Sequence, residues 1–312
     1  MHWAKIQEAG SLAGMRFLLS VYRIFGRWPF RFFLFFVLLW FYARRRAARE
    51  ASRDYLRRLR GFSNGATPLP TRLNVFRHFL AFSEIALDKL LAVGAVNPPE
   101  DYRLDGLEHI DSLLAQKRGA VLVTAHLGNT DLCRKLGEHY VDARITVLAH
   151  TKNAVRFNRL LKECNSEYDV DLIQVTDINI GTAILLAERV ESGGLIVIAG
   201  DRVPVGDSAA TVRVPFLGAE ASFPISPYVL AAALQCPLLA IFGVRRLDGF
   251  VVILRPIAES VLLPRRARSA AVVPYAAAFA ELLEAECLKA PFQWSNFYQF
   301  WALPEPANKE SS

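Results

Sequence analysis

The residues best suited to chemistry lie where a short apolar run ends in a histidine. Residues 120–131 read Ala-Val-Leu-Val-Thr-Ala-His-Leu-Gly-Asn-Thr-Asp. Histidine titrates near neutral pH, and a carboxylate on one ring nitrogen fixes the tautomer so that the other nitrogen can accept a proton. The segment therefore predicts His126 as a general base oriented by Asp131, as acyl transfer to a hydroxyl or an amine requires.

The local sequence also indicates how these two side chains are positioned. Val121 to Ala125 is typical of a buried strand, and a histidine at its end faces the crevice in which open α/β sheets bind ligands. Gly128 permits an unusual turn, Asn129 can cap the following helix, and Asp131 falls in its first turn. The spacing alone also fits a strand-end histidine bonded to backbone and an acid at a helix start, so this alternative stays open.

A second candidate site follows a later apolar strand. Residues 195–200 read Leu-Ile-Val-Ile-Ala-Gly and lead into Asp201 and Arg202. Charged side chains at this strand end can converge with His126 on one crevice. A solvent-facing turn is the alternative interpretation of Asp201 and Arg202.

Two further segments draw attention by composition. Residues 213–226 predict a loop of small residues leading into a helix at Pro224, where free backbone amides suit an anion or an acyl chain, and Arg213 can meet a phosphate. Residues 291–301 hold six aromatic side chains in eleven positions. Closure of the core is the ordinary interpretation of that aromatic run, and an acyl-chain groove is the more specific one.

Charge and hydropathy are uneven along the 312 residues. Residues 1–60 hold 13 Lys and Arg against 3 acids, a balance of +10, whereas the rest hold 24 against 27, a balance of −3. Hydrophobic residues make up 53% of the chain, which is high for a freely soluble enzyme. The four cysteines show no C-x-x-C spacing, which indicates a reducing compartment, and neither a metal-ligand spacing nor a G-x-x-x-x-G-K-[ST] loop occurs.

The N-terminal region predicts a membrane-associated helical segment. Its longest uncharged run, Phe32 to Ala43, has 12 residues and is short of the roughly 20 that span a bilayer. We expect a helix lying in the membrane interface, with a spanning helix as the second option and a core-packed hairpin as the third. The arginine-rich stretch up to Arg60 should remain cytoplasmic. A turn-rich break at 61–71 then divides the chain into a membrane-associating segment, 1–60, and a catalytic domain, 61–312.

Apolar runs alternate with helical patterns through the second region, which predicts an α/β fold with a mostly parallel central sheet flanked by helices. The expected strands are 120–125, 144–149, 170–175, 195–199, 238–244 and 250–255. The expected helices are 72–94, 131–140, 153–164, 180–192, 224–235 and 269–289, and 103–116 starts as a strand and continues as a helix.

Four sequence blocks together resemble a known enzyme family. His126-Leu-Gly-Asn-Thr-Asp131 resembles the H-x4-[DE] motif of the lysophospholipid acyltransferase superfamily, and its Leu-Gly-Asn centre resembles the lipid A lauroyl/myristoyl acyltransferase branch. Three later blocks follow in the order of that branch: Gly200-Asp-Arg-Val-Pro204, Val214-Pro-Phe-Leu-Gly218 and Pro291-Phe-Gln-Trp294. The resemblance covers roughly residues 15–301.

The resemblance implies an acyltransferase of the HX4D type on the cytoplasmic face of the cell inner membrane. It implies transfer of a fatty acyl group from an acyl carrier protein or coenzyme A thioester, without a cofactor or metal, to a hydroxyl or amine of a lipid or glycolipid. His126 deprotonates the acceptor and Asp131 orients His126. The residues expected at the substrates are Gly128, Asn129, Arg159, Asp201, Arg202 and Arg213.

The chain departs from that branch in two ways. The branch usually ends its first motif with an aromatic residue and Glu, where this chain has Thr130 and Asp131. The branch usually has an arginine between the first two blocks. This chain has no clear counterpart, and Arg156 and Arg159 are the nearest options. These departures indicate a lipid, glycolipid or amino-acid headgroup other than lipid A as the acceptor.

Two other functions remain open at the level of sequence: a lipid hydrolase that uses the same His/Asp pair on water, and a non-catalytic membrane-anchored lipid-binding protein. Nucleic acid is not an expected partner. The basic stretch from Arg44 to Arg60 contains Tyr55 as its one aromatic residue, and the remainder of the chain is not basic.

Overall fold

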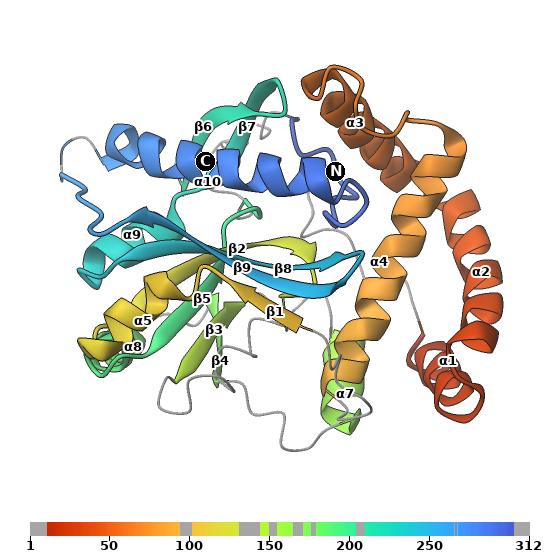
Figure 1. The fold of residues 1–312 in the computed structure, drawn as a ribbon, viewed down its shortest axis with the longest axis horizontal. Coiled ribbons are helices and arrows are strands. Elements are labelled where there is room, and N and C mark those ends of the chain that lie inside the picture. Colours follow the sequence, from red (N-terminus) through yellow and green to blue (C-terminus); the bar gives the residue numbers. More distant parts are fainter. Residues whose placement is uncertain are drawn as a thin grey trace, which may run out of the picture.

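A seven-stranded sheet forms the centre of the molecule (Figure 1). The computed structural model describes residues 11–93, 102–130, 144–149, 155–164, 171–175, 179–203, 210–264, 266 and 268–302. The strand order is β1-β9-β8-β2-β5-β3-β4. The strands are β1 (Tyr102–Asp105), β2 (Ala120–Gly128), β3 (Ile145–Ala149), β4 (Asp171–Gln174), β5 (Leu195–Ala199), β8 (Leu238–Arg246) and β9 (Gly249–Ala258).

Five adjacent strands of this sheet, from β8 to β4, run parallel, and β1 and β9 run parallel to each other in the opposite direction. The central strands β2 and β5 are apolar and buried on both faces, as expected of parallel strands covered by helices. The α/β fold with a mostly parallel sheet is therefore confirmed, and the predicted strands lie within a few residues of the observed ones.

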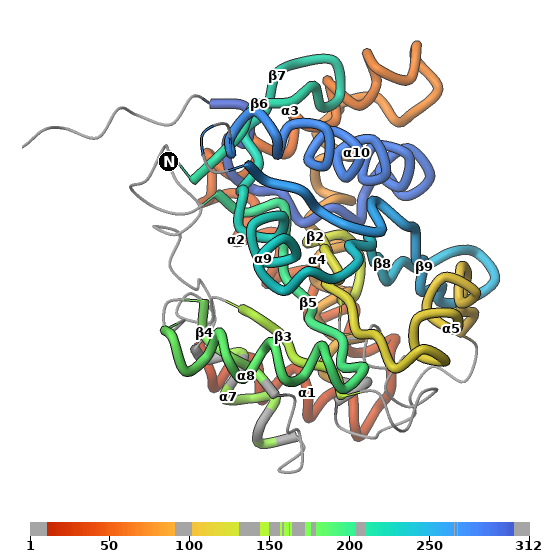
Figure 2. The backbone as a smooth tube through the Cα atoms, turned by 90° about the vertical axis from the view of Figure 1, so that its left-hand side faces the viewer, coloured from red at the N-terminus to blue at the C-terminus, as the bar shows by residue number. Residues whose placement is uncertain are grey.

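Helices cover both faces of the sheet. Alternate residues of β2, beginning with Val121 and Val123, face a large core cluster that includes α10 (Arg268–Lys289) and α9 (Ser226–Ala233). The intervening residues pack with Ile110 and Leu113 of α5 (Glu108–Ala115). Figures 1 and 2 show α10 toward the top of the molecule and α8 (Ile180–Glu191) toward the bottom, near β3 and β4. Leu186 and Val190 of α8 belong to the same core cluster as α10, so these two helices cover one face and α5 covers the other.

Four N-terminal helices stand at one side of the sheet: α1 (Leu12–Phe25), α2 (Arg27–Arg44), α3 (Arg46–Phe62) and α4 (Arg72–Val93) (Figure 1). The inner faces of α1 and α2 pack on α4 through residues such as Phe30, Leu34 and Leu87. Leu90 of α4 and Leu160 of α7 (Val155–Cys164) pack against α1 in a separate cluster. Among the described helices, none is both long and apolar enough to cross a bilayer.

Helix α3 is joined to the main core although six of its 17 residues are arginine. Tyr55, Leu56 and Leu59 are fully buried in the same cluster as the sheet and α10. Their spacing places them on one face of the helix, opposite its exposed arginines. Residues 55–59 therefore contribute to the stability of the α/β body, and the predicted domain division at residues 60 and 61 stays a prediction.

The segment expected to be a small-residue loop is instead a hairpin. Strands β6 (Thr211–Phe216) and β7 (Ala219–Pro224) pair antiparallel, and α9 begins at Ser226, two residues after the predicted start. Burial alternates strictly along β6, which is the pattern of a half-buried strand. Leu217 and Gly218 both have positive φ, as a type I′ hairpin turn requires. The helix predicted at 131–140 lies outside the described residues.

Candidate active site

His126 is held at the end of β2 by an irregularity in the sheet. The pairing of β2 with β8 shifts register between Thr124 and Gly128. Gly128 has φ +64°, and a Cβ atom there would lie 2.1 Å from the carbonyl oxygen of Gly243. Only glycine fits this close approach, which fixes the path of the chain directly after His126.

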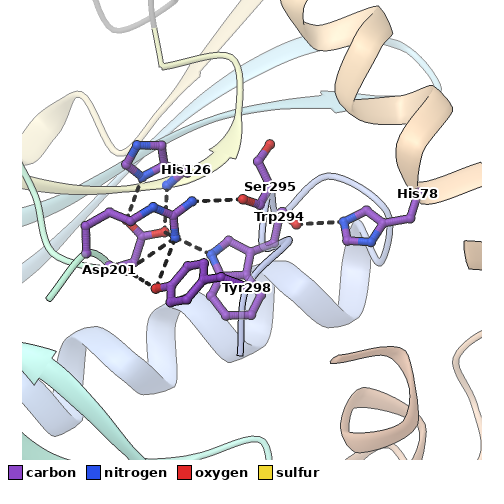
Figure 3. A network of polar contacts seen from close by, with 7 residues as sticks. His78, His126, Asp201, Trp294, Ser295 and Tyr298 are labelled. Atoms are coloured by element: carbon purple, nitrogen blue, oxygen red, sulfur yellow. Dashed lines mark hydrogen bonds and ion pairs between the residues drawn. The ribbon is translucent and has the colours of Figure 1, made fainter. Parts of the chain in front are cut away.

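Asp201 meets His126 from the neighbouring strand. Gly200, directly after β5, donates its N–H to the Thr124 carbonyl at 2.7 Å, which sets the position of the next residue. The fully buried Asp201 then faces His126, with 2.8 Å between Oδ1 and Nδ1 (Figure 3). The backbone N–H of His126 donates to Oδ2 at 3.0 Å. Adjacent parallel strands thus bring residues 75 positions apart into direct contact.

The protonation state of this pair follows from its partners. Burial tends to raise the pKa of Asp201, but the charge of Arg202, the charge that His126 carries when protonated and the hydrogen bonds from His126 outweigh it and hold that pKa well below its usual range. An ionised carboxylate only accepts hydrogen bonds, so Nδ1 of His126 carries the proton and Nε2 keeps its lone pair. The tautomer that results is the one a general base needs.

The surroundings also keep His126 neutral near pH 7. Its side chain is 46% exposed, which leaves room for a substrate to approach the ring. Desolvation by the surrounding protein, followed by the charge of Arg202, lowers the pKa of His126 from the ordinary value of 6.5, against the opposing influence of Asp201. A neutral imidazole is the form that can take a proton from an acceptor.

A C-terminal segment, residues 293–298, wraps around the pair and is called here the C-terminal strap. The indole N–H of Trp294 donates to Asp201 Oδ2 at 3.0 Å, and the Ser295 N–H donates to the His126 carbonyl at 2.7 Å. The Tyr298 hydroxyl donates to the Asp201 carbonyl at 3.1 Å, and Arg202 Nη2 donates to the Ser295 carbonyl at 2.8 Å (Figure 3). The strap therefore closes one side of the site.

The sequence-predicted site residues are distributed as follows. His126, Asp201 and Arg202 come together, and Gly128 and Asn129 lie directly beyond His126, with the Asn129 N–H donating to the Gly243 carbonyl at 2.7 Å. Asp131 lies outside the described residues.

The two other predicted arginines lie on separate elements. Arg159 is exposed on α7, 3.4 Å from Glu163, and Arg213 is exposed on β6. Within the part of the chain that the structure describes, no polar contact joins either of them to His126, and no group of three or more His, Cys, Asp or Glu could hold a metal ion.

Sequence reasoning did not find Trp294, Ser295 and Tyr298 as partners of the pair. The aromatic run at 291–301 was the available signal, but composition does not tell which aromatic side chain carries a polar contact. The pairing of Trp294 with Asp201 spans 93 positions, and no local pattern encodes a contact at that separation.

An imidazole held by a buried carboxylate at the carboxyl edge of a parallel sheet defines a site for general-base chemistry. The family model for the bacterial lipid A biosynthesis acyltransferase matches residues 89–302, which is more than half of the chain, and the protein belongs to this family. A search of the curated proteins gives no match to the chain. Membership indicates acyltransferase activity on a lipid.

Proposed function

We propose that the protein transfers a fatty acyl group from a thioester of acyl carrier protein or coenzyme A to a hydroxyl or amine of a membrane lipid or glycolipid. The observation that carries the proposal is the 2.8 Å contact between His126 Nδ1 and the buried Asp201 carboxylate, which leaves Nε2 as a proton acceptor. Membership in a family of lipid acyltransferases supplies the reaction class.

In the proposed reaction His126 acts twice. Nε2 takes the proton as the acceptor oxygen or nitrogen attacks the thioester carbonyl, and a tetrahedral intermediate forms. The C–S bond then breaks, and His126 returns the proton to the departing thiolate, so the products are an acylated acceptor and a free thiol. Ionised Asp201 stabilises the imidazolium between these steps and keeps its tautomer. The attack is direct, and no covalent enzyme intermediate is needed.

Arg202 supports this chemistry by balancing the charge of Asp201. Its side chain is largely buried, and its terminal nitrogens contact Asp201, Ser295 and Tyr298. These contacts favour a role in holding Asp201 ionised. Asp131 as an orienting acid stays a prediction, as do contacts of the substrates with Gly128, Asn129, Arg159 and Arg213.

The exposed face of α2 supports attachment to a membrane surface. One face of α2 is packed on α4, while on the other the exposed fraction is 80% for Trp28, 61% for Phe32 and 53% for Trp40. A continuous exposed apolar patch of this kind marks an interaction site, and Trp side chains suit the lipid headgroup level. We propose that this face lies in the cytoplasmic interface of the inner membrane.

Two arginines near the end of α3 suit an acidic donor carrier. Arg57 and Arg60 line a surface depression with Gly61, Asn64 and Gly65. An acidic acyl carrier protein would be attracted to this surface, and salt would screen that attraction. Added salt should therefore raise the donor KM, and a donor KM that does not respond to salt would exclude this docking.

Lipid mass spectrometry on cells expressing wild type or His126→Ala tests the proposed function. We expect one lipid to gain an acyl group in wild-type cells and to lose it in the variant. His109→Ala on α5 is a matched control, because His109 has no contact with the pair, and should behave as wild type. Release of free fatty acid without an acylated lipid would indicate a hydrolase, and identical lipids in all cells would favour a non-catalytic binding protein.

A further inference from the structure

The carboxylate of Asp201 receives a second constraint from a residue distant in sequence. Its Oδ1 contacts the ring of His126, while its Oδ2 accepts from the His126 backbone at 3.0 Å and from the Trp294 indole at 3.0 Å. Arg202 Nη1 lies further away, at 3.4 Å from Oδ2. The indole N–H is therefore the one short side-chain contact to Oδ2 among the described residues.

We propose that Trp294 is a positioning residue that acts on His126 through Asp201. The inference rests on the proposed role of His126 as the general base. A carboxylate rotates about its Cβ–Cγ bond unless both oxygens are held. With the Trp294 donor on Oδ2, Oδ1 stays aimed at Nδ1 of His126 and the proton stays on that nitrogen. Without it, Oδ2 keeps the His126 backbone N–H and the longer contact to Arg202 and loses its one short side-chain donor. The carboxylate is then held less firmly, and the other tautomer of His126, which has no lone pair on Nε2, becomes more accessible.

Trp294 is suited to this task because it is itself held at both ends. Its backbone carbonyl accepts a hydrogen bond of 2.8 Å from Nε2 of the buried His78 (Figure 3). Its ring packs against Tyr55, Phe216 and Phe300, at centroid distances of 5.1, 5.3 and 5.0 Å. A donor-only side chain in a packed setting has one direction in which to place its N–H.

The backbone on either side of Trp294 ties this support to the strand that carries His126. The Gly128 N–H donates to the Gln293 carbonyl at 2.9 Å, and Trp294 itself forms an antiparallel bridge with Leu127. The positions of the indole, the carboxylate and the imidazole are therefore all fixed relative to the end of β2. Such a closed arrangement is what holds a site residue within the narrow geometry that catalysis needs.

The test uses two Trp→Phe substitutions in one aromatic cluster. Trp294→Phe keeps a ring and removes the N–H that meets Asp201. Trp301→Phe is the matched control, because its indole N–H donates to the Phe216 carbonyl at 3.1 Å and not to Asp201. The proposal predicts that Trp294→Phe lowers kcat about 10- to 100-fold with little change in the acceptor KM, and that Trp301→Phe leaves both near wild type. Equal losses in the two variants would reduce Trp294 to a packing residue.

A spectroscopic readout separates this inference from the proposed function. The ¹⁵N shifts of His126 in labelled protein should report a proton on Nδ1 in wild type and in Trp301→Phe, and a mixture of tautomers in Trp294→Phe. An unchanged tautomer in Trp294→Phe overturns the inference whether or not the protein transfers acyl groups. Absence of transfer by wild type, with the tautomer change present, overturns only the proposed function.

A second measurement applies if Trp294→Phe does not fold. Among the indole N–H signals of the wild-type protein, one should shift in Asp201→Asn, because its acceptor changes from a carboxylate to an amide. The same signal should remain in Trp301→Phe. Indole signals that do not respond to Asp201→Asn would overturn the inference.

Discussion

The buried His78 should make the fold sensitive to mild acid. It lies on α4 with no exposed surface, and its Nε2 donates to the Trp294 carbonyl while Nδ1 accepts from the Ser52 hydroxyl at 2.8 Å. A second proton would have to enter at Nδ1 and displace the Ser52 donor. Burial lowers the pKa of His78 from 6.5 to about 4, against the opposing hydrogen bond to Trp294.

The magnitude follows from the difference between these two pKa values. Unfolded His78 binds a proton as the pH falls through 6.5, whereas folded His78 does so only near pH 4. Its contribution to stability is therefore complete above about pH 6.5 and declines as the pH falls toward 4. A difference of about 2.5 units corresponds to about 3 kcal/mol in the free energy of unfolding.

Urea unfolding of wild type and His78→Gln between pH 7 and pH 4 measures this contribution. Glutamine can still donate to the Trp294 carbonyl but does not titrate, so wild type should lose about 3 kcal/mol of stability relative to His78→Gln as the pH falls over this range. Val75→Ala, a buried truncation on the same helix, should differ from wild type by the same amount at pH 7 and at pH 4. A stability difference between wild type and His78→Gln that does not change with pH would show that protonation of His78 does not destabilise the fold.

Three further predictions concern the site and the membrane face. Asp201→Asn should lower the rate of acyl transfer about 10²- to 10⁴-fold, because the tautomer of His126 is no longer enforced. A smaller loss in Asp201→Asn than in Asp131→Asn would assign the orienting role to Asp131 instead. Since His126 must be neutral to act and its pKa is lowered, kcat/KM should be level at pH 7 and fall only below pH 6.5; an acid limb centred above pH 7 would contradict this. The double substitution Trp28→Ser and Trp40→Ser should weaken binding to anionic vesicles about 10- to 100-fold in flotation assays. Unchanged binding would exclude this face of α2 as the membrane-binding surface.

The convergence of His126 with Asp201 could be foreseen from sequence because it depends on local signals. Each follows a short apolar run, and neighbouring parallel strands bring their carboxyl ends to one edge of the sheet. The pairing itself could not be foreseen, because strand order is set by packing of the whole chain. The sequence motif predicts Asp131 as the partner of His126, and that prediction lies outside the described residues; among the described residues, the carboxylate in contact with His126 is that of Asp201.

In two other segments, the residue composition and the periodicity of the sequence indicate different structures. Buried and exposed side chains alternate strictly around Val212 and Val214, which is the pattern of a strand. The glycine and proline content of residues 213–226 favours a loop instead. In α3, apolar residues at helical spacing, such as Tyr55 and Leu59, lie among arginines that dominate the composition. The arginines lie on the outer face of this helix, and the periodic apolar residues lie on the face that joins the core.

The strap was beyond prediction for a different reason. Its contacts to Asp201 and His126 come from Trp294, Ser295 and Tyr298, more than ninety positions away from Asp201. They depend on irregular backbone that closes over the sheet after α10. No periodicity specifies where such a segment settles, so its role became visible only from the structure.

In the proposed mechanism, Nε2 of His126 takes the proton of the acceptor. Transfer of a labelled acyl group from a thioester donor to extracted membrane lipids by purified wild type, His126→Ala and His109→Ala at pH 7 tests this step. We expect a loss of at least about 100-fold in His126→Ala, with the wild-type rate in His109→Ala. Transfer at the wild-type rate by a folded His126→Ala protein would contradict it.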